Sequence, residues 1–200
     1  MRVAYLGPPG TVSDEALAAA APQFEPVPLS TLRDVVLAVQ EGRVERALAP
    51  VENALEGGVD PVLDALALEA PDVAIIGEVL QPVSYCLAAG RQVALDEITV
   101  VRSHPQALGQ CKNWLAKHLP QAATVPAIST ADAVREAAED ERGILAAIGP
   151  RLAARRYGAV MLAEDLEDDP GNATRFAWLA PVADAPPPPE DGPAKTSLVF

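Results

Sequence analysis

Residues 98–118, ITVVRSHPQALGQCKNWLAKH, indicate how the whole chain folds. The run Ile98–Ser103 has the length and the apolar character of a buried strand. Apolar residues then recur at helical spacing over Pro105–His118, and proline suits the first position of a helix. A strand that passes through a short polar turn directly into a helix is the repeating unit of α/β proteins. The stretch therefore predicts an α/β fold.

The same alternation extends to both sides of this stretch. Further strands are predicted at Val3–Gly7, Pro26–Ser30, Arg46–Glu52, Val73–Leu80, Thr124–Ser129, Leu145–Gly149, Val160–Glu164 and Arg175–Leu179. Further helices are predicted at Ser13–Ala20, Thr31–Glu41, Val59–Leu68, Thr130–Glu139 and Pro150–Tyr157. Strands that alternate with helices predict mostly parallel sheets. Pro82 interrupts the extended stretch Val73–Ala89, which makes this stretch a candidate crossing between two lobes.

Composition limits the classes of function. The chain has 200 residues, half of them apolar, and a net charge of -13, which disfavours nucleic acid and anionic membranes as partners. No apolar run approaches the roughly 20 residues needed to span a bilayer. The N-terminus enters a strand without a leader-like segment, so we expect a cytoplasmic protein. Two cysteines without a CxxC pair and only two histidines argue against a zinc site.

Three predicted strands end in a small polar turn that leads into a helix. The turns are residues 7–13, 103–106 and 129–132, and each offers free backbone N–H groups at a helix N-terminus. In open α/β sheets such turns gather at the carboxyl edge, so together they predict an anion-binding cleft. For each turn taken alone, the alternative is that its serine only caps the helix; these serines are Ser13, Ser103 and Ser129.

Other polar residues also stand where they could bind a ligand. Gln106 and Gln110 are four residues apart and share a helix face, which is either a ligand-binding or a solvated face. Asn53 follows a strand, where a short amide is first of all a turn former. Thr174 can donate one hydrogen bond, and Arg175 can hold a carboxylate bidentately. The simpler interpretation of Arg175 is a surface salt bridge on an edge strand.

Taken together, these motifs resemble the prephenate dehydratase family. They occur in the family's order and cover residues 1 to about 181. The specific blocks are SHPQALGQC (103–111) and TRF (174–176), joined by YLGP (5–8), PVEN (50–53) and STA (129–131). Ala54 departs from the pattern, because the family usually has serine after the motif asparagine. That hydroxyl is then absent or supplied by another group, such as Thr11, Ser103 or Thr130.

The resemblance implies two α/β lobes similar to a periplasmic-binding protein, with the active site in the cleft between them. It implies a lyase of phenylalanine biosynthesis that decarboxylates and dehydrates prephenate to phenylpyruvate without a metal or other cofactor. Thr174 is implied as the catalytic residue. The expected substrate-binding residues are Thr11, Asn53, Ser103, Gln106, Gln110, Thr130, Arg175 and Phe176. The small-molecule partner is expected to be prephenate, and the protein is expected to form a homodimer.

Two alternative functions stay open at this point. An arogenate dehydratase would act on a substrate with an amino group in place of the keto group, and the sequence does not separate the two activities. A non-catalytic two-lobed module that binds a small anion would explain the polar turns without a catalytic residue. The TRF block has no obvious task in such a module.

The expected domain boundaries follow from these patterns. The catalytic domain is expected over residues 1–182, with one lobe at about 1–77 and 168–182 and the other at about 78–167. Residues 183–195, which include four consecutive prolines, are predicted to be an extended linker. Residues 196–200 resemble the first strand of an ACT regulatory domain. Because one strand cannot form an effector site, we expect turnover without inhibition by phenylalanine.

Overall fold

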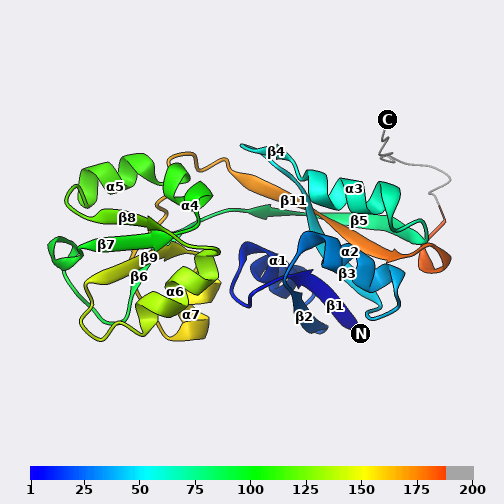
Figure 1. Ribbon diagram of the computed structural model, residues 1–200, viewed down its shortest axis with the longest axis horizontal. Coiled ribbons are helices and arrows are strands. Elements are labelled where there is room, and N and C mark those ends of the chain that lie inside the picture. The colour runs from blue at the N-terminus through cyan, green and yellow to red at the C-terminus, as the bar shows by residue number, and fades with distance from the viewer. Residues whose placement is uncertain (188–200) are drawn as a thin grey trace. The chain divides into compact units, whose positions relative to one another are not determined.

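The computed structural model describes residues 1–187, which form two compact units, each built around one sheet (Figure 1). Among the described residues, unit 1 contains Met1–Leu6, Ala16–Gln81 and residues 174–187, and unit 2 contains Gly7–Glu15 and Pro82–Ala173. The expected lobe boundaries at 77/78 and 167/168 are therefore replaced by crossings at 81/82 and 173/174, and the segment Gly7–Glu15 belongs to unit 2. The later part of the predicted linker and the predicted ACT strand lie outside the described residues.

The sheet of unit 1 has the strand order β2-β1-β3-β11-β5, with the short β4 paired to β3. Strand β1 is parallel to β2 and β3, whereas β11 is antiparallel to β3. The strands are β1 (Arg2–Leu6), β2 (Glu25–Leu29), β3 (Arg46–Asn53), β4 (Gly57–Gly58), β5 (Val73–Pro82) and β11 (Ala173–Pro181).

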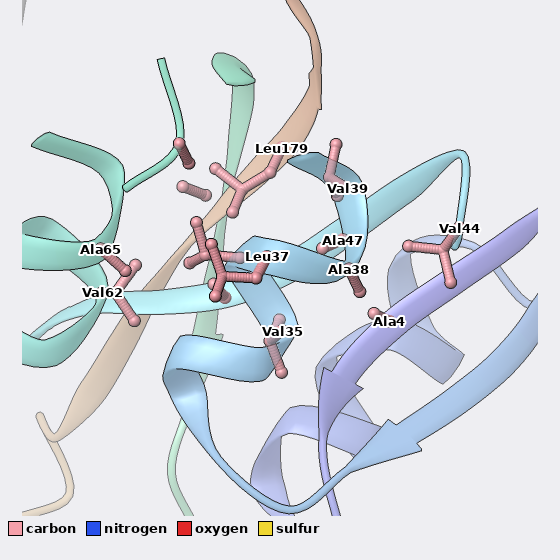
Figure 2. Packing of buried hydrophobic residues seen from close by; sticks show 14 of the residues in the cluster. Ala4, Val35, Leu37, Ala38, Val39, Val44, Ala47, Val62, Ala65 and Leu179 are labelled. Atoms are coloured by element: carbon pink, nitrogen blue, oxygen red, sulfur yellow. The ribbon is translucent and has the colours of Figure 1, made fainter. Parts of the chain in front are cut away.

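Two helices cover the core of unit 1. Helix α2 (Leu32–Gln40) begins where the side chain of Thr31 accepts the N–H of Asp34 at 3.0 Å, and its residues from Val35 to Val39 are buried. Helix α3 (Asp60–Leu68) adds Val62 and Ala65. Figure 2 shows these side chains together with Ala4 of β1, Ala47 of β3 and Leu179 of β11. A short 3-10 turn, η2 (Val182–Asp184), follows β11.

The sheet of unit 2 has the strand order β10-β6-β9-β7-β8. Its strands are β6 (Cys86–Ala89), β7 (Val100–Ser103), β8 (Ala123–Pro126), β9 (Leu145–Gly149) and β10 (Val160–Glu164). Its helices are α4 (Pro105–Gln110), α5 (Lys112–His118), α6 (Thr130–Ala138), α7 (Arg151–Tyr157) and the 3-10 turn η1 (Leu95–Glu97). Helix α1 (Val12–Ala20) begins in unit 2 and ends in unit 1.

The two faces of this sheet carry side chains of different size. Leu87, Val101 and Ile148 pack with residues of α4 and α5, whereas the residues that pack with α6 and α7 are mostly alanine. Figure 1 shows α4 and α5 on one side of this sheet and α6 and α7 on the other. Successive residues of a strand point to opposite faces, so the alternation of large and small residues along β6 and β9 produces this difference. Small residues let α6 approach closely: a Cβ on Gly149 would lie 2.5 Å from the Val134 side chain.

The α/β prediction is confirmed, but each sheet is mixed rather than mostly parallel. In unit 2, β9, β7 and β8 are parallel, whereas β6 is antiparallel to both β9 and β10. Parallel neighbours require a crossover between the strands, which the helices α4–α6 provide. Strand β6 comes soon after the crossing at 81/82, and β11 spans the crossing at 173/174, so neither strand is directly preceded by such a helix.

Candidate active site

Thr174 and Asn53 form a buried pair in unit 1. They are direct partners in the antiparallel ladder of β11 and β3, which places their side chains next to each other on one face of the sheet. Each residue is 9% exposed. The Asn53 Nδ2 donates to the Thr174 Oγ1 at 2.9 Å. The register of the sheet therefore brings together two residues that are far apart in the sequence.

The Asn53 amide is held in one orientation by the turn that follows it. Its Oδ1 accepts the N–H of Leu55 at 3.0 Å and of Glu56 at 3.1 Å, so Nδ2 is the end that faces Thr174. The predicted turn-forming role of Asn53 is thus present together with the contact to Thr174. Because Thr174 Oγ1 accepts from Asn53, its own proton stays available, and within residues 1–187 we find no acceptor for it.

Arg175 points away from this pair. It lies opposite Glu52 in the ladder, on the other face of the sheet from Thr174, because successive strand residues alternate. Its Nε and Nη2 donate to Glu52 Oε2 at 2.9 and 2.6 Å, and its Nη1 lies 3.5 Å from Glu78 Oε2. This geometry favours the surface salt bridge over the predicted binding of a substrate carboxylate by Arg175.

Phe176 is one of the largest fully buried side chains within residues 1–187. It is 1% exposed and lies in the interior of the protein. A β-bulge between Arg175 and Phe176 shifts the ladder at this point. This burial supports a packing role for Phe176, and its predicted substrate contact stays a prediction.

In unit 2, the predicted helix over residues 105–118 is interrupted at Cys111. The carboxylate of Asp168 accepts the N–H groups of Asn113 at 3.0 Å and Trp114 at 3.3 Å, and the Asp168 N–H donates to Gln110 O at 2.7 Å. In a continuous helix, the Trp114 N–H would donate to Gln110 O. Here Asp168 satisfies both of these groups instead. It ends α4 and caps α5.

This break places Gln110 at the C-terminal end of α4. Asn172 Nδ2 donates to Gln110 Oε1 at 3.0 Å. The other end of the amide, Nε2, is buried and has no hydrogen-bond partner within residues 1–187. Gln106, one turn earlier, is exposed to solvent. Of the two predicted glutamines, Gln110 is therefore the one with a buried donor available for a ligand.

Ser103 and Thr130 differ in what they can offer. Ser103 is fully buried, and its Oγ donates to Ile148 O at 2.6 Å, so the hydroxyl retains only acceptor capacity. It does not cap α4; His104 does, by accepting the Gln106 N–H with its Nδ1 at 3.3 Å. Thr130 is the half-buried first residue of α6, while Ser129 caps that helix, in agreement with the alternative interpretation.

The glycine turn after β1 is occupied by groups of the protein itself. Asp14 Oδ2 accepts the Gly10 N–H at 2.7 Å and the Arg156 Nη1 at 3.1 Å. Gly10 has a φ of 94°, and a Cβ there would lie 3.1 Å from Ala153 Cα in α7. Thr11 Oγ1 accepts the Asp14 N–H at 3.3 Å, so Thr11 and not Ser13 caps α1. The Asp14 carboxylate therefore occupies the Gly10 N–H, one of the backbone donors that the sequence predicts for a substrate anion.

One acidic residue is not indicated by the sequence. Burial raises the pKa of Glu15, against the opposing effects of a hydrogen bond from the backbone of Leu152 and of Arg151 and Arg155. Glu15 therefore stays protonated to higher pH than an ordinary glutamate. Nothing in so acidic a sequence distinguishes it from its neighbours. Glu52 and Glu56, the two glutamates near Asn53, are exposed.

Both cysteines are buried free thiols. Burial raises the pKa of Cys86 to about 11 and of Cys111 to about 12, so both thiols are poor nucleophiles. Residues 1–187 contain no group of three or more His, Cys, Asp or Glu side chains that could hold a metal ion. In the same residues, no helix is both long and apolar enough to cross a membrane.

Comparison with known proteins identifies the family. The family model for prephenate dehydratase matches residues 3–183. The chloroplastic arogenate dehydratase 5 of Arabidopsis thaliana is 40% identical over 200 residues, which cover 100% of this chain and 46% of the relative. The chain thus spans about half the length of that relative.

Two solved structures have the same fold. The prephenate dehydratase of Arthrobacter aurescens in complex with L-Phe is 34% identical with a TM-score of 0.83, covering 98% of this chain and 62% of that one. GqqA, described as a novel type of quorum quenching acylase, is 30% identical with a TM-score of 0.81, covering 97% and 67%. Since the family model matches almost all of the described residues, the chain belongs to the prephenate dehydratase family.

Proposed function

We propose that this chain catalyses the decarboxylating dehydration of prephenate to phenylpyruvate, with Thr174 as the catalytic hydroxyl. Family membership supports the reaction, and the Asn53–Thr174 pair supports the role. The Asn53 amide takes an acceptor position of the Thr174 oxygen at 2.9 Å, which leaves the hydroxyl proton for another oxygen. A buried and oriented donor of this kind is suited to stabilise negative charge on a departing oxygen.

The chemistry breaks two bonds that join the substrate ring to its substituents, one to a carboxylate and one to a hydroxyl group. The electrons of the bond to the leaving carboxylate move into the ring, which becomes aromatic and expels its hydroxyl group as hydroxide. Carbon dioxide leaves, and the hydroxide becomes water when it takes up a proton. Because aromatisation drives the reaction, the protein has mainly to position the ring and stabilise the departing oxygen. A threonine hydroxyl is too weak an acid to give up its proton fully, so Thr174 hydrogen-bonds this oxygen.

Residues of unit 2 are proposed to bind the substrate. Gln110 brings a buried N–H2 group, and Thr130 brings a hydroxyl at the start of α6 that no residue within 1–187 engages. We assign direct contacts to these two residues and a peripheral contact to the exposed Gln106. Ser103 and Thr11 receive supporting roles, because the first donates to Ile148 O and the second caps α1. The predicted location of the active site between the lobes stays a prediction.

Arogenate is the second candidate substrate. The specific observation is that a relative 40% identical over the whole chain is named an arogenate dehydratase. Arogenate has an amino group where prephenate has a keto group, and the ring chemistry assigned to Thr174 is the same for both. The fold by itself does not determine the chemistry, because one fold can support several activities.

A side-by-side assay of the purified chain with prephenate and arogenate tests the proposal. We expect turnover of prephenate, with one carbon dioxide released per phenylpyruvate formed. A clear preference for arogenate would select the second candidate. Binding of prephenate by calorimetry without turnover of either substrate would instead favour the non-catalytic anion-binding module.

Expectations about partners and location stay predictions. The net charge of -13 supports the absence of nucleic acid among the partners. The homodimer and the cytoplasmic location are implied by family resemblance and by the N-terminal sequence. Sedimentation of the purified chain would measure its oligomeric state directly.

A further inference from the structure

A residue outside the predicted site determines the orientation of Gln110. Asn172 Nδ2 donates to Gln110 Oε1 at 3.0 Å, and Gln110 Nε2 is buried without a partner within residues 1–187. We infer that Asn172 is a positioning residue, which directs the N–H2 group of Gln110 toward an oxygen acceptor of the substrate. The inference rests on the proposed function, because it treats Gln110 as a substrate-binding residue.

The polarity of this pair determines which ligand atom fits. An amide side chain has an acceptor oxygen at one end and a donor nitrogen at the other, and a half-turn exchanges them. While Asn172 holds Oε1, the free end of Gln110 can only donate. A buried donor without a partner is costly, so this position favours a ligand that brings an acceptor oxygen. The carboxylate and keto oxygens of prephenate are acceptors.

Asn172 is itself fixed well enough to act in this way. It is 2% exposed, its N–H donates to Asp169 O at 3.3 Å, and its O accepts the N–H of Val83 at 2.9 Å. Both of these hydrogen bonds are made by the backbone and are available to any non-proline residue at position 172. Substitution of the side chain therefore changes the partner of Gln110 while the path of the chain keeps its support.

The same segment also fixes the main chain of Gln110. Asp168 N–H donates to Gln110 O at 2.7 Å, so Gln110 is held at its carbonyl by Asp168 and at its side chain by Asn172. Thr174 follows Asn172 by two residues, and the two Cα atoms therefore lie within about 7 Å of each other. One short segment thus orients the proposed binding amide and carries the proposed catalytic hydroxyl.

Reversal of the polarity at position 172 tests the inference. In Asn172→Asp the new carboxylate can only accept, so Gln110 turns its N–H2 group toward it and presents Oε1 to the substrate. In Asn172→Ala the amide can turn freely, and its donor remains available for part of the time. We expect kcat/KM to fall roughly 100-fold in Asn172→Asp and roughly tenfold in Asn172→Ala.

A Gln110→Ala background separates orientation of the amide from other effects. In that background, Asn172→Asp should lower kcat/KM by less than about threefold, because no amide is left to orient. An effect of negative charge alone, or of damaged packing, would persist there at full size. The melting temperature of each variant shows whether loss of folded protein contributes to the measured rates.

Two results would overturn the positioning role. One is an Asn172→Asp variant that is no slower than Asn172→Ala, and the other is a full loss from Asn172→Asp in the Gln110→Ala background. A wild-type chain that turns over neither prephenate nor arogenate is a different result. It would refute the proposed function, and the role of Asn172 in substrate binding would fall with it.

Discussion

Unit 1 and unit 2 each place a buried asparagine against a candidate site residue, but by different means. In unit 1, Asn53 and Thr174 are opposite each other in the β3–β11 ladder. In unit 2, Asn172 reaches Gln110 from a loop, and Gln110 lies at a helix end that Asp168 creates. A ladder is fixed by many backbone hydrogen bonds, whereas the loop pair depends on a few contacts. Substitutions in unit 1 should therefore affect the chemistry more than the geometry, and those in unit 2 should affect both.

The largest effect is expected from Thr174→Val. It removes the hydroxyl that we propose to stabilise the departing oxygen, while the ladder and the volume of the side chain are kept. We expect kcat to fall by about 100- to 1,000-fold, with little change in KM, because the lost interaction acts mainly in the transition state. Steady-state kinetics with prephenate measures both constants.

Thr174→Ser is the matched control for this variant. It keeps the hydroxyl and loses one methyl group, so kcat should stay much closer to the wild-type value than in Thr174→Val. An unchanged kcat in folded Thr174→Val protein would remove Thr174 from the mechanism. Equal losses in the two variants would point to packing of the methyl group instead of the hydroxyl.

The next largest effect is expected from Asn53→Asp. The new side chain can still accept the N–H groups of Leu55 and Glu56, so the turn is kept. It has no N–H to donate to Thr174, and the threonine hydroxyl then donates to the carboxylate instead of to the substrate. We expect a loss in kcat of about 10- to 100-fold with the free energy of unfolding nearly unchanged. A loss of stability that accounts for the lower rate would contradict this role.

Asp168→Ala should have a smaller effect on kcat, and it should also change KM and the free energy of unfolding. It removes the cap of α5 and one of the supports of the α4–α5 break, which should lower the free energy of unfolding by about 1 kcal/mol. The backbone N–H at position 168 still donates to Gln110 O, but the loss of the carboxylate contacts to Asn113 and Trp114 loosens the α4–α5 break next to Gln110. KM should therefore rise more than kcat falls, because Thr174 is left in place. Urea unfolding and steady-state kinetics of the same preparation test both expectations. A drop in kcat as large as in Thr174→Val would contradict the division of roles between the units.

The smallest effect is expected from Arg175→Lys. Arg175 lies on the opposite face of the sheet from Thr174 and pairs with two exposed glutamates. Exposed ion pairs contribute about 0 to 1 kcal/mol, and kcat/KM should change less than about twofold. Glu52→Gln, which weakens the same pair from the other side, should behave alike. A large rise in KM in Arg175→Lys alone would restore the prediction that Arg175 binds a substrate carboxylate.

Most of the fold could be predicted because its elements are encoded locally. The predicted strand Leu145–Gly149 matches β9, and the ends of α2 shift by one residue. The predicted strand Thr124–Ser129 ends three residues beyond β8, and β6 is not predicted as a separate strand. The break at Cys111 could not be predicted, since its cause is Asp168, which lies far along the chain. The antiparallel pairing of β6 likewise depends on where the chain crosses between the units.

The candidate site could be predicted only in part, because its contacts join residues that are far apart in the sequence. The sequence indicates Thr174, Asn53 and Gln110 as polar residues at the ends of elements, but it does not show which atoms face each other. The pairing of Asn53 with Thr174 follows from a ladder register, and Asn172 gains its role only through Gln110. By contrast, strict alternation along β11 would have been enough to place Arg175 on the other face from Thr174.

A double substitution tests the central claim most directly, namely that Asn53 acts through the hydroxyl of Thr174. We would measure kcat for prephenate in the wild type, Thr174→Val, Asn53→Asp and the double variant, with unfolding curves to confirm that all four are folded. If Asn53 only directs the Thr174 proton, the double variant should be no slower than Thr174→Val. If the losses of the two single variants multiply in the double variant, the two residues act independently, and the proposed action of Asn53 through Thr174 is contradicted.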